Sequence, residues 1–381
     1  MGTVGLSPKE SEMKFFGRKA ARGTGRPFLF AGLRGMFAAE PWPRSYEAQV
    51  REAYLGNPVA QRAVRLVAES VAWAPIFASG GREDAARLLP PALLETVATQ
   101  LLLHGNAFVQ LLPDADGLPA ELFALRPERV GVEADASGWP AAYLYKVGEA
   151  KSRIPAKDGL GRPAMVHLKA AHPLDDHYGL GCLGAAAGAV AVHNAAAKWN
   201  KALLDNAARP SGALIYDSGD GAALSGAQFE RLRAEMEAQF SGSDNAGRPL
   251  LLEGGLKWQA MSLTPADMDF VGLKAAAARE IALAFGVPPM LLGLPGDATY
   301  ANYREANRAL WRLTVLPMAA RILRGIGDAL ASWWPGLGLA VDMDRISALA
   351  EERERLWRQV SAADFLSDEE KREMLGFSNA P

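Results

Sequence analysis

The sequence contains a single cysteine, Cys182, which excludes an internal disulfide and any metal site made of several cysteines. The composition therefore fits a reducing cytosol and needs no oxidising compartment. Long apolar runs are also absent, because the two most apolar stretches, residues 93–112 and 183–204, are interrupted by polar and charged side chains. Neither stretch suits a bilayer span, and the chain start lacks the basic-then-apolar order of a signal peptide. We expect a soluble protein without membrane contact, made in the cytoplasm.

Two signatures of enzymes are missing as well. No Walker A sequence is present, so there is no phosphate loop for nucleotide hydrolysis, and no G-x-S-x-G elbow marks a serine nucleophile. Strong net charge is missing too, since 41 basic and 43 acidic residues leave a formal charge of −2. That balance argues against a protein that grips nucleic acid electrostatically. A protein that lets DNA slide past without holding it needs no basic surface, so this class stays open.

The chain is long enough for two or three domains, since 381 residues of 49% hydrophobic composition can build more than one core. Residues 1–44 mix Gly, Arg, Lys and Pro with little periodicity and predict a flexible N-terminal arm. Asn57 is a good helix cap, Pro58 suits the first helical position, and an amphipathic pattern continues to residue 71. A second helix is predicted over residues 91–104, ending at Gly105.

A β-rich segment follows these two helices. Five short runs of strand-forming residues are separated by turn residues: 107–112, 122–125, 130–133, 142–147 and 165–169. Their order predicts a small sheet or partial barrel packed on the two helices, and hence an α+β fold.

Two long helices are predicted next, with a small insert between them. The first is Ala-rich, covers residues 184–207 and stops at Arg209-Pro210. The second is opened by Thr264 as its cap, with Pro265 at the first helical position, and leads to Gly286. A pair of helices that carries an insert at its end is the geometry of a projecting module.

The insert has a β-α-β-β pattern. A strand at 213–216 precedes a helix that Ser225 and Gln228 open with the spacing of a capping box. Residues 250–252 and 257–263 then predict a hairpin that turns at two consecutive glycines, 254 and 255.

Residues 286–317 are the most informative segment. Pro288 and its neighbouring proline end the preceding helix, because proline cannot continue the hydrogen-bond ladder. Among glycines and prolines the loop then carries three leucines: Leu291, Leu292 and Leu294. Asp297 or Thr299 can cap the helix that follows. We expect apolar side chains on a mobile turn, which does not describe a catalytic site but suits a loop presented to a large partner.

The remaining sequence is predicted to be mostly helical. The helix after Pro317 continues to about Trp333 and is followed by a strand at 339–343. A charged helix over 344–363 precedes a final short one, and its run 351–355 is interpreted as a solvated face with i,i+4 ion pairs.

Three patterns have an alternative interpretation. Gly179, Gly181 and Gly184 match the G-x-G-x-x-G fingerprint of dinucleotide-binding enzymes, but the predicted strand ends about ten residues before the first of them. A loop that contains His172, Asp175, Asp176 and His177 could hold a metal, although its spacing fits an Asx turn equally well. The Ala-rich helices suit either an ordinary core or close packing of identical helices around an axis. His193, on the first of them, is interpreted as a core or interface residue.

Several short sequences, in this order, resemble those of the portal proteins of long-tailed phages, prophages and gene transfer agents. The motifs that carry the resemblance, which covers about 57–377, are Gly105-Asn106-Ala107-Phe108-Val109, Leu125-Arg126-Pro127, Val166-His167-Leu168, Tyr178-Gly179-Leu180, Gly286-Val287-Pro288-Pro289, Tyr300-Ala301-Asn302 and Phe365-Leu366-Ser367-Asp368. The chain departs from the pattern at Gly181-Cys182, where relatives have Ser-Pro, and its short tail implies a small crown.

The resemblance implies a portal-protein fold that divides into named parts. These are a flexible arm (1–44), an α/β wing (45–183), a first stem helix (184–208), a clip insert (209–263), a second stem helix (264–286), a tunnel loop (287–303), a long wing helix and strand (304–343) and a short helical crown (344–381). It implies no enzymatic activity and no cofactor.

The resemblance also implies a function and partners. It implies a homododecameric ring at the unique capsid vertex, through which double-stranded DNA passes without sequence specificity during packaging and ejection. The ring would contact the major capsid protein, the large terminase and the head-tail adaptor, and it would be assembled in a bacterial host and end in the virion. The alternative function is a dinucleotide-binding enzyme that uses Gly179, Gly181 and Gly184, and a third possibility is an adaptor or scaffold that forms no DNA channel.

Three sets of residues receive roles from the resemblance. The tunnel loop would touch DNA through Leu291, Leu292, Gly293, Leu294, Asp297, Tyr300 and Asn302. The stem would face the channel or the next subunit with Lys198, Lys201, Lys274 and Arg279. The clip would dock adaptor and terminase through Tyr216, Phe229, Arg233 and Trp258.

Overall fold

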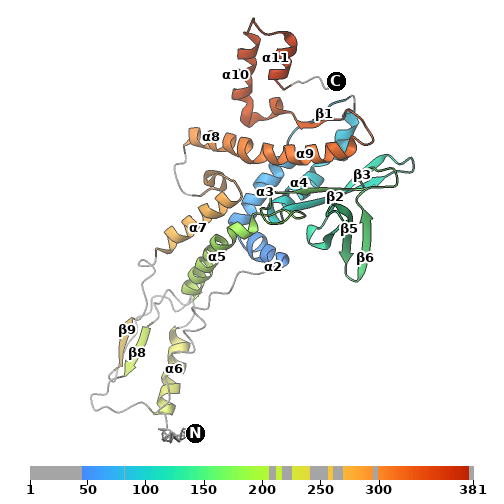
Figure 1. Cartoon of the computed structure of the whole chain (residues 1–381). Helices are drawn as coiled ribbons and strands as arrows, with labels where there is room; N and C mark the ends of the chain where they lie inside the picture. Colours follow the sequence, from blue (N-terminus) through green and yellow to red (C-terminus); the bar gives the residue numbers. More distant parts are fainter. Residues whose placement is uncertain are drawn as a thin grey trace, which may run out of the picture. The chain divides into compact units, whose positions relative to one another are not determined.

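The computed structural model describes residues 45–80, 82–205, 212–216, 225–240, 256–260, 269–294 and 299–376. The predicted arm, 1–44, lies outside these ranges. Within them the fold is α+β, and Figure 1 shows its helices and strands along the chain.

Two predicted helices form where the capping residues place them. After α2 (Tyr46–Val50) and a π-helical turn, η1 (Arg51–Leu55), the side chain of Asn57 accepts hydrogen bonds from the backbone N–H groups of Val59 and Ala60, both at 3.0 Å. This cap opens α3 (Pro58–Ala72). The next helix, α4 (Pro91–Leu103), ends at Gly105, whose φ of 82° only glycine adopts without strain.

A long helix crosses this pair and has an interruption that the sequence did not predict. It consists of α8 (Tyr300–Leu310), the π-helical segment η6 (Trp311–Val315) and α9 (Leu316–Leu330). Pro317 lies in the first turn of α9, and because it has no backbone N–H it cannot complete the ordinary ladder. The wider turn of η6 accommodates this break. The helix ends at Leu330, slightly before the predicted end at Trp333.

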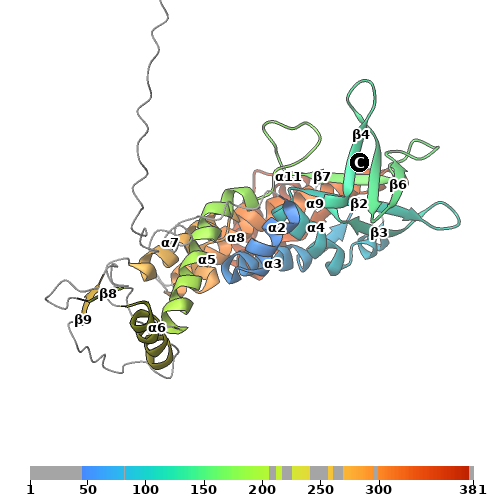
Figure 2. The same ribbon diagram turned by 90° about the horizontal axis from the view of Figure 1, so that it is seen from below.

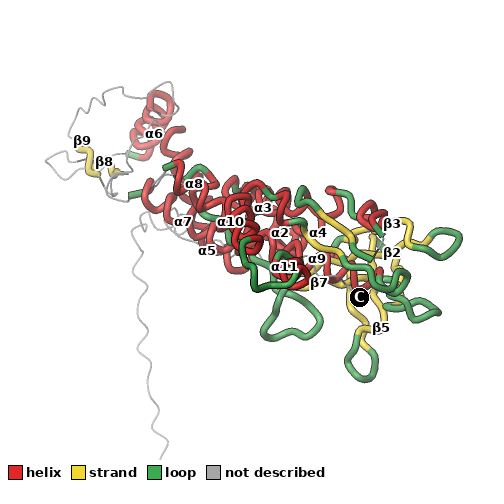
Figure 3. Tube along the Cα trace, turned by 90° about the horizontal axis from the view of Figure 1, so that it is seen from above, coloured by secondary structure: helices red, strands yellow, loops and turns green. Residues whose placement is uncertain are grey.

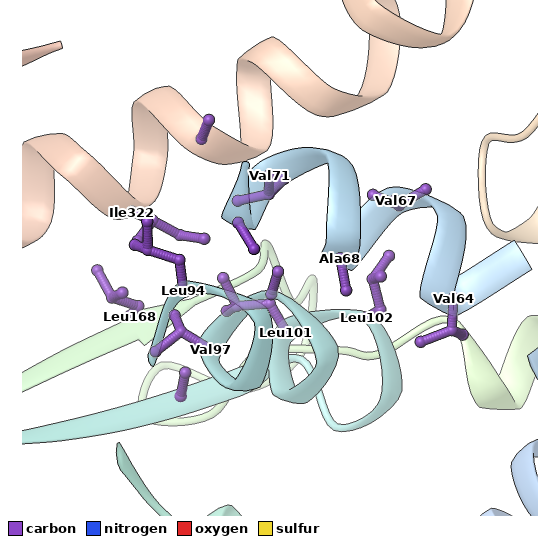
Figure 4. Close-up of a cluster of buried hydrophobic side chains, with 14 of the residues drawn as sticks. Val64, Val67, Ala68, Val71, Leu94, Val97, Leu101, Leu102, Leu168 and Ile322 are labelled. Atoms are coloured by element: carbon purple, nitrogen blue, oxygen red, sulfur yellow. The ribbon is translucent and has the colours of Figure 1, made fainter. Parts of the chain in front are cut away.

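These helices share one apolar core with the strands. Figure 4 shows side chains from α3, α4, α9 and strand β7 meeting in it. The labelled members are Val64, Val67, Ala68, Val71, Leu94, Val97, Leu101, Leu102, Leu168 and Ile322. Burial of these apolar groups is the main favourable term that holds α3, α4 and α9 together.

The β-rich segment forms two antiparallel three-stranded sheets (Figure 3). In the first, β2 (Asn106–Pro113) lies between β3 (Pro119–Leu125) and β7 (Met165–Lys169) and packs on α4. In the second, β5 (Pro140–Val147) lies between β4 (Val130–Ala134) and β6 (Ala150–Pro155). An edge-to-face contact between Phe108 and Tyr143, with ring centroids 5.7 Å apart, joins them.

Two strands were missed by the sequence analysis. β6 is almost entirely exposed and polar, so it lacks the apolar alternation of a half-buried strand. β1 (Ile76–Ala78) has three residues and pairs with β10 (Leu339–Val341), which was predicted, far along the chain. A 3-10 segment, η2 (Glu83–Leu88), follows β1.

The predicted insert is described in three pieces. β8 (Gly212–Tyr216) pairs antiparallel with β9 (Leu256–Ala260). α6 (Gly226–Phe240) is opened by the predicted capping box, in which the backbone N–H of Ser225 donates to Oε1 of Gln228 at 2.9 Å. The predicted hairpin partner, 250–252, lies outside the described residues.

The two helices that flank the insert pack on each other as a pair, α5 (Leu183–Asp205) and α7 (Phe270–Ala284) (Figure 2). Trp199, near the end of α5, stacks on Phe270 at the start of α7, so the helices run antiparallel. The predicted start of the second helix is corrected. Its N-cap is Asp269, whose carboxylate accepts from the backbone N–H of Gly272 at 3.1 Å, and the predicted cap Thr264 lies outside the described residues.

The C-terminal part begins with two 3-10 turns, η7 (Met343–Arg345) and η8 (Ser347–Leu349), where a continuous helix was predicted. The helices are α10 (Ala350–Ser361) and α11 (Asp368–Met374), and Ser367 with Glu370 forms a capping box at the second. Among the described residues, none of the helices combines the length and the apolar character needed to cross a membrane.

Candidate functional site

The loop that follows α7 is held at its first residue. Gly286 has a φ of 67°, and its carbonyl oxygen accepts a hydrogen bond of 2.7 Å from the hydroxyl of Thr314 in η6. A Cβ atom at Gly286 would lie 2.8 Å from that hydroxyl oxygen, so both the conformation and the close approach require glycine. The loop therefore starts from a fixed point on the long helix.

The first leucines of this loop are not on a free turn, which corrects the prediction. Leu291 and Leu292 belong to a 3-10 turn, η5 (Pro289–Leu292), and pack, half-buried, against the main core. The turn ends at Gly293, whose φ of 72° gives a left-handed C-cap. Leu294 is also half-buried but is not among the residues that pack on that core. The core draws in the two preceding leucines because burial removes their apolar surface from water.

The other side of the loop is the start of α8. Thr299 is its N-cap, with a side chain that accepts from the backbone N–H of Asn302 at 3.2 Å, and so one of the two predicted caps is confirmed. The alternative cap, Asp297, lies outside the described residues. Tyr300 is the first helical residue, and Asn302 is exposed in the first turn of α8. The DNA-contact role of all these residues stays a prediction.

The four predicted stem cations do not have equivalent positions. Lys198, Lys201 and Arg279 are exposed on the outer sides of α5 and α7. Lys274 is half-buried, and its charge adds to burial in lowering the pKa of His193 on α5. Lys274 therefore lies close to the α5–α7 contact, while the other three face outward from it.

His193 belongs to a hydrogen-bonded network that attaches α5 to the start of α3. Its Nδ1 lies 3.1 Å from the side-chain amide nitrogen of Asn57, the residue that also caps α3. The same amide nitrogen donates to Oδ1 of Asn194 at 2.8 Å, and the amide of Asn194 donates to the backbone carbonyl of Glu52 at 3.1 Å. The interpretation of His193 as a buried structural residue is thus supported by its contacts.

The predicted clip residues lie on two elements of the insert. Tyr216 is half-buried at the end of β8, whereas Phe229 and Arg233 are exposed four residues apart on α6. Arg233 is 3.9 Å from Glu230. Trp258 lies on β9 opposite Leu214 of β8, and its side chain is outside what the structure describes. Their docking role stays a prediction.

The glycines of the G-x-G-x-x-G match have a packing role in the structure. A Cβ atom on Gly179 would clash with the backbone of Gly105 and Ala170, and one on Gly181 would clash with the backbone of Leu103. The backbone N–H of Ala170 donates to the carbonyl of Gly105 at 2.8 Å across this contact. The preceding strand, β7, ends at Lys169, far from the position that a phosphate-binding turn requires. The first two glycines allow a loop to lie against the end of α4, and this geometry is not that of a dinucleotide site.

Asn106 is the polar centre of that contact and was missed as a structural residue. Its side chain, fully buried, accepts from the backbone N–H of Gly179 at 2.7 Å and donates to the carbonyl of Gly179 at 3.1 Å. The same amide also contacts two imidazoles, with Nε2 of His167 3.0 Å from Oδ1 and Nδ1 of His104 3.0 Å from Nδ2. An amide can accept and donate at once, which a sequence pattern does not reveal.

Burial controls the protonation of both imidazoles. The pKa of His167 is lowered to about 4, first by burial and then by the positive charge of Lys169. Burial also lowers the pKa of His104. Both rings are therefore neutral at pH 7, and Oδ1 of Asn106 can only accept, so Nε2 of His167 carries the proton.

The loop proposed as a metal site is organised by backbone contacts. Oδ1 of Asp175 accepts from the backbone N–H groups of His177 and Tyr178, at 2.8 and 2.9 Å, which is an Asx turn. Nδ1 of His172 accepts from the backbone N–H of Leu174 at 3.1 Å. Within the described ranges, no three His, Cys, Asp or Glu side chains are grouped as ligands would be.

Residues 351–355 were predicted to form a solvated face, but two of them, Glu351 and Glu352, form ion pairs with arginines of α8 and η6. Arg304 and Arg308 both contact Glu351, at 2.7 and 2.9 Å, and Arg308 and Arg312 both contact Glu352, at 3.7 and 3.4 Å. The side chain of Arg308 is only 18% exposed. The four-residue spacing of the arginines was visible in the sequence, but their partners on another helix were not.

Comparison with known proteins gives a consistent result. Residues 58–376 match the protein family described as Phage portal protein. An uncharacterized protein of Rickettsia felis is 43% identical over 350 residues, covering 85% of this chain and 88% of that protein. A probable portal protein of Streptomyces phage phiC31 is 26% identical over 247 residues, covering 62% of this chain and 52% of that protein.

Solved structures agree with the sequence relatives. A chain in the virion of a native gene transfer agent particle is 48% identical, with a TM-score of 0.67 over 88% of this chain and 94% of that chain. A chain from the neck of such a particle, computed with twelvefold symmetry, is 47% identical, with a TM-score of 0.65 over 91% and 98%. A phage portal protein from Corynebacterium diphtheriae is 17% identical with a TM-score of 0.55 and shows the likeness of fold alone.

Proposed function

This chain belongs to the phage portal protein family, a family of structural proteins rather than enzymes, and from that premise we propose that it forms the portal ring of a phage or gene transfer agent particle. The ring would lie at one vertex of the capsid, with double-stranded DNA passing along its axis. The observation that supports this most strongly is the likeness to the neck chain of a twelvefold-symmetric gene transfer agent particle over 91% of this chain.

We further propose that the chain divides into the functional parts that the sequence predicts. Residues 45–183 would be the wing, α5 and α7 the stem, the insert with β8, α6 and β9 the clip, and residues 344–381 the crown. The antiparallel packing of α5 on α7 supports a two-helix stem, because the pair ends where the insert begins.

The loop between α7 and α8 is the candidate for DNA contact. It is fixed at Gly286 by Thr314, and the helix that follows it starts from the Thr299 cap, so that Leu294 lies between two anchored points of the described chain. Apolar side chains in such a loop would touch DNA without binding phosphates, which keeps the contact weak and lets DNA move. With a formal charge of −2 the chain adds no strong electrostatic hold.

The partners of the ring would be those of a portal. The exposed Phe229 and Arg233 on α6 are the proposed contacts for the large terminase and the head-tail adaptor, while the capsid protein would surround the wing. A chain lacking 211–263 should form no complex with adaptor or terminase, and adaptor binding that survived this deletion would place the docking surface elsewhere.

Electron microscopy of the purified protein, with native mass spectrometry on the same sample, tests the proposal. Closed rings with a pore as wide as duplex DNA are the expected result. A scaffold or adaptor without a channel predicts assemblies that lack such a pore. If the chain remains monomeric both alone and in cell extracts that contain assembled particles, the proposed function is wrong.

A further inference from the structure

Three arginines form a row on one side of the long helix. Arg304, Arg308 and Arg312 are four residues apart, so their side chains leave successive turns of α8 and η6 on the same side. This arginine row starts in the second turn of α8, close to the helix end that follows the candidate DNA loop. At a rise of about 1.5 Å per residue it extends over about 12 Å. One strand of DNA carries about three phosphates over that length.

The arginine row is paired with carboxylates of another helix. Glu351 of α10 contacts both Arg304 and Arg308. Glu352, also on α10, contacts both Arg308 and Arg312. Each glutamate therefore lies between two arginines of the row, and α10 places its negative charge where a phosphate would have to bind.

One further acid belongs to the same helix as the arginines. Glu305 of α8 lies 3.0 Å from Arg308. Without α10, three guanidinium groups would share this single carboxylate, and that side of α8 and η6 would carry a net charge of +2. The whole chain has a formal charge of −2, so attraction for phosphates would be local to the row and would depend on the position of α10.

The helix α10 is attached mainly by these charges. The structure describes all of α10, and Val360 is the one residue of this helix that is buried. A groove of about 490 Å³ remains between α10 and the long helix, lined by Arg312 and Leu316 on one side and by Leu356 and Gln359 on the other. Apolar packing between the helices is thus incomplete, and little buried surface opposes their separation.

The fit between the row and the glutamates is also imperfect. The Nε atom of Arg308 is buried and has no hydrogen-bond partner among the described residues, and Oε1 of Glu352 lies 3.7 Å from it. A buried charged donor without an acceptor is unfavourable, and a phosphate oxygen would satisfy it. The side chain of Glu351 is 64% exposed, so that other anions can reach its pairs and compete with it.

We propose that the arginine row is a binding site for the phosphates of duplex DNA, and that α10 covers it through Glu351 and Glu352. The inference rests on the proposed function, which supplies DNA as the ligand beside this helix. With α10 in place the contact with DNA stays weak, and DNA can slide. Displacement of α10 exposes the row, whose guanidinium groups then hold the DNA backbone. Because DNA binds the uncovered row, it also favours the displaced position of α10.

Neutral glutamines in place of the covering glutamates test the site. The variant Glu351→Gln/Glu352→Gln should bind a labelled DNA duplex about tenfold more tightly than the original chain at about 50 mM salt. Its log K should fall more steeply with log salt concentration, by about two units of slope, because a net charge of +2 neutralises about two phosphates. Replacing the three arginines of the row with glutamine in this variant should restore the original affinity and slope. Fluorescence anisotropy with the full chain measures both.

The matched control makes the same change of charge at other ion pairs. Glu133→Gln/Glu354→Gln raises the net charge equally and releases Arg153 and Arg358 from exposed pairs. It should leave the affinity and the slope close to those of the original chain. An equal gain in the control would show that net charge alone acts, and the proposed site would be wrong. The same holds if the gain persists after the three arginines are replaced.

Hydrogen exchange tests the cover in the original chain. Saturating duplex DNA should raise the exchange of α10 about fivefold, whereas inorganic phosphate at the same ionic strength should leave it unchanged. Unchanged exchange in the DNA complex would mean that α10 covers no DNA site. An equal rise with inorganic phosphate would identify a general anion site and overturn the choice of DNA.

Electron microscopy of the same samples separates this inference from the proposed function. If the original chain and the variant Glu351→Gln/Glu352→Gln both form rings and the variant gains no DNA affinity, the covered site is wrong and the proposed function stands. If the variant gains affinity but neither protein forms rings, alone or in particles, the proposed ring is wrong and the arginine row remains a DNA site.

Discussion

The hydroxyl of Thr314 donates a hydrogen bond of 2.7 Å to the carbonyl oxygen of Gly286. It ties the π-helical segment η6 to the residue at which α7 passes into the candidate DNA loop. Two residues before Thr314, Arg312 contacts Glu352 of α10 at 3.4 Å. The segment η6 thus contacts the loop through one side chain and the C-terminal helices through another, and π-helical segments are frequent at functional sites.

Gly286→Ala should destabilise the protein by about 2 kcal/mol, since a side chain is strained in the left-handed conformation. The added Cβ would also lie 2.8 Å from the Thr314 hydroxyl and disturb its hydrogen bond. Urea unfolding measures the change. Gly138→Ala is the control, because Gly138 has a φ of 85° but open space around it. Equal losses from both variants would mean that the contact with Thr314 adds nothing.

The half-buried His167 makes the stability depend on pH. Its pKa is about 4 in the folded chain against an ordinary value of 6.5, because burial and Lys169 disfavour the imidazolium. Between these values the unfolded chain binds a proton that the folded chain does not, so the free energy of unfolding falls as the pH drops from about 6.5 to 4. The loss levels off below pH 4 and amounts to at most about 3 kcal/mol.

His167→Gln isolates this contribution, because a glutamine amide can still donate to Oδ1 of Asn106 but does not titrate. Burial also lowers the pKa values of His104 and His193. The variant therefore keeps part of the pH dependence of the original chain. Chemical unfolding at pH 7.0 and 4.5 should therefore show a smaller difference for the variant. The same difference in both proteins would contradict the assignment.

Much of the local structure could be predicted from the sequence because capping signals act over a few residues. Asn57 before Pro58, Gly105 after α4 and the pair Ser225 and Gln228 all end or open helices as expected. Residues with no local signal were missed. The strand β6 is polar and exposed, and the start of α7 at Asp269 depends on a single short-range hydrogen bond.

The candidate site was less predictable, since its contacts join residues far apart in the chain. Nothing in the pattern of Leu291 and Leu292 distinguishes a free loop from a 3-10 turn packed on the core. The structure has the second arrangement, because both side chains pack on core residues that lie far away in the sequence. In the sequence, Asn106 has the pattern of an ordinary strand residue. Its hydrogen bonds with Gly179 and with two histidines become visible only in the structure. Burial of polar groups against distant partners is a tertiary property, and the residue types alone do not encode it.

The ion pairs of Arg308 should stabilise the attachment of α10 to α8. Its side chain is 18% exposed and lies 2.9 Å from Glu351, so it is less screened by water than a surface pair. Arg308→Gln should raise the hydrogen exchange of α10 about fivefold, equivalent to about 1 kcal/mol of local stability. Arg358→Gln is the control, because the Arg358–Glu354 pair of 2.5 Å is exposed on both sides. Comparable exchange in the two variants would show that the interhelical ion pairs stabilise α10 no more than an exposed pair does.

The role of the loop is best tested at Leu294. Aspartate at Leu291 or Leu292 would place a charge against the core and unfold the turn, so loss of activity there would not distinguish folding from DNA contact. Leu294 follows the left-handed Gly293 and is not among the residues that pack on the core. In Leu294→Asp particles we expect intact rings but at least tenfold less retained DNA, since carboxylates on the loop repel phosphates.

Leu294→Ala separates charge from bulk, and Leu160→Asp controls for a new carboxylate on the surface. If repulsion is the cause, raising the salt from 50 to about 500 mM should restore part of the retention in Leu294→Asp and leave Leu294→Ala unchanged, because salt screens charge but does not replace a missing side chain. Nuclease-protected DNA per particle is the measurement. Normal filling and retention in Leu294→Asp would mean that this loop does not touch DNA, and the contact would then have to be sought on another element of the ring.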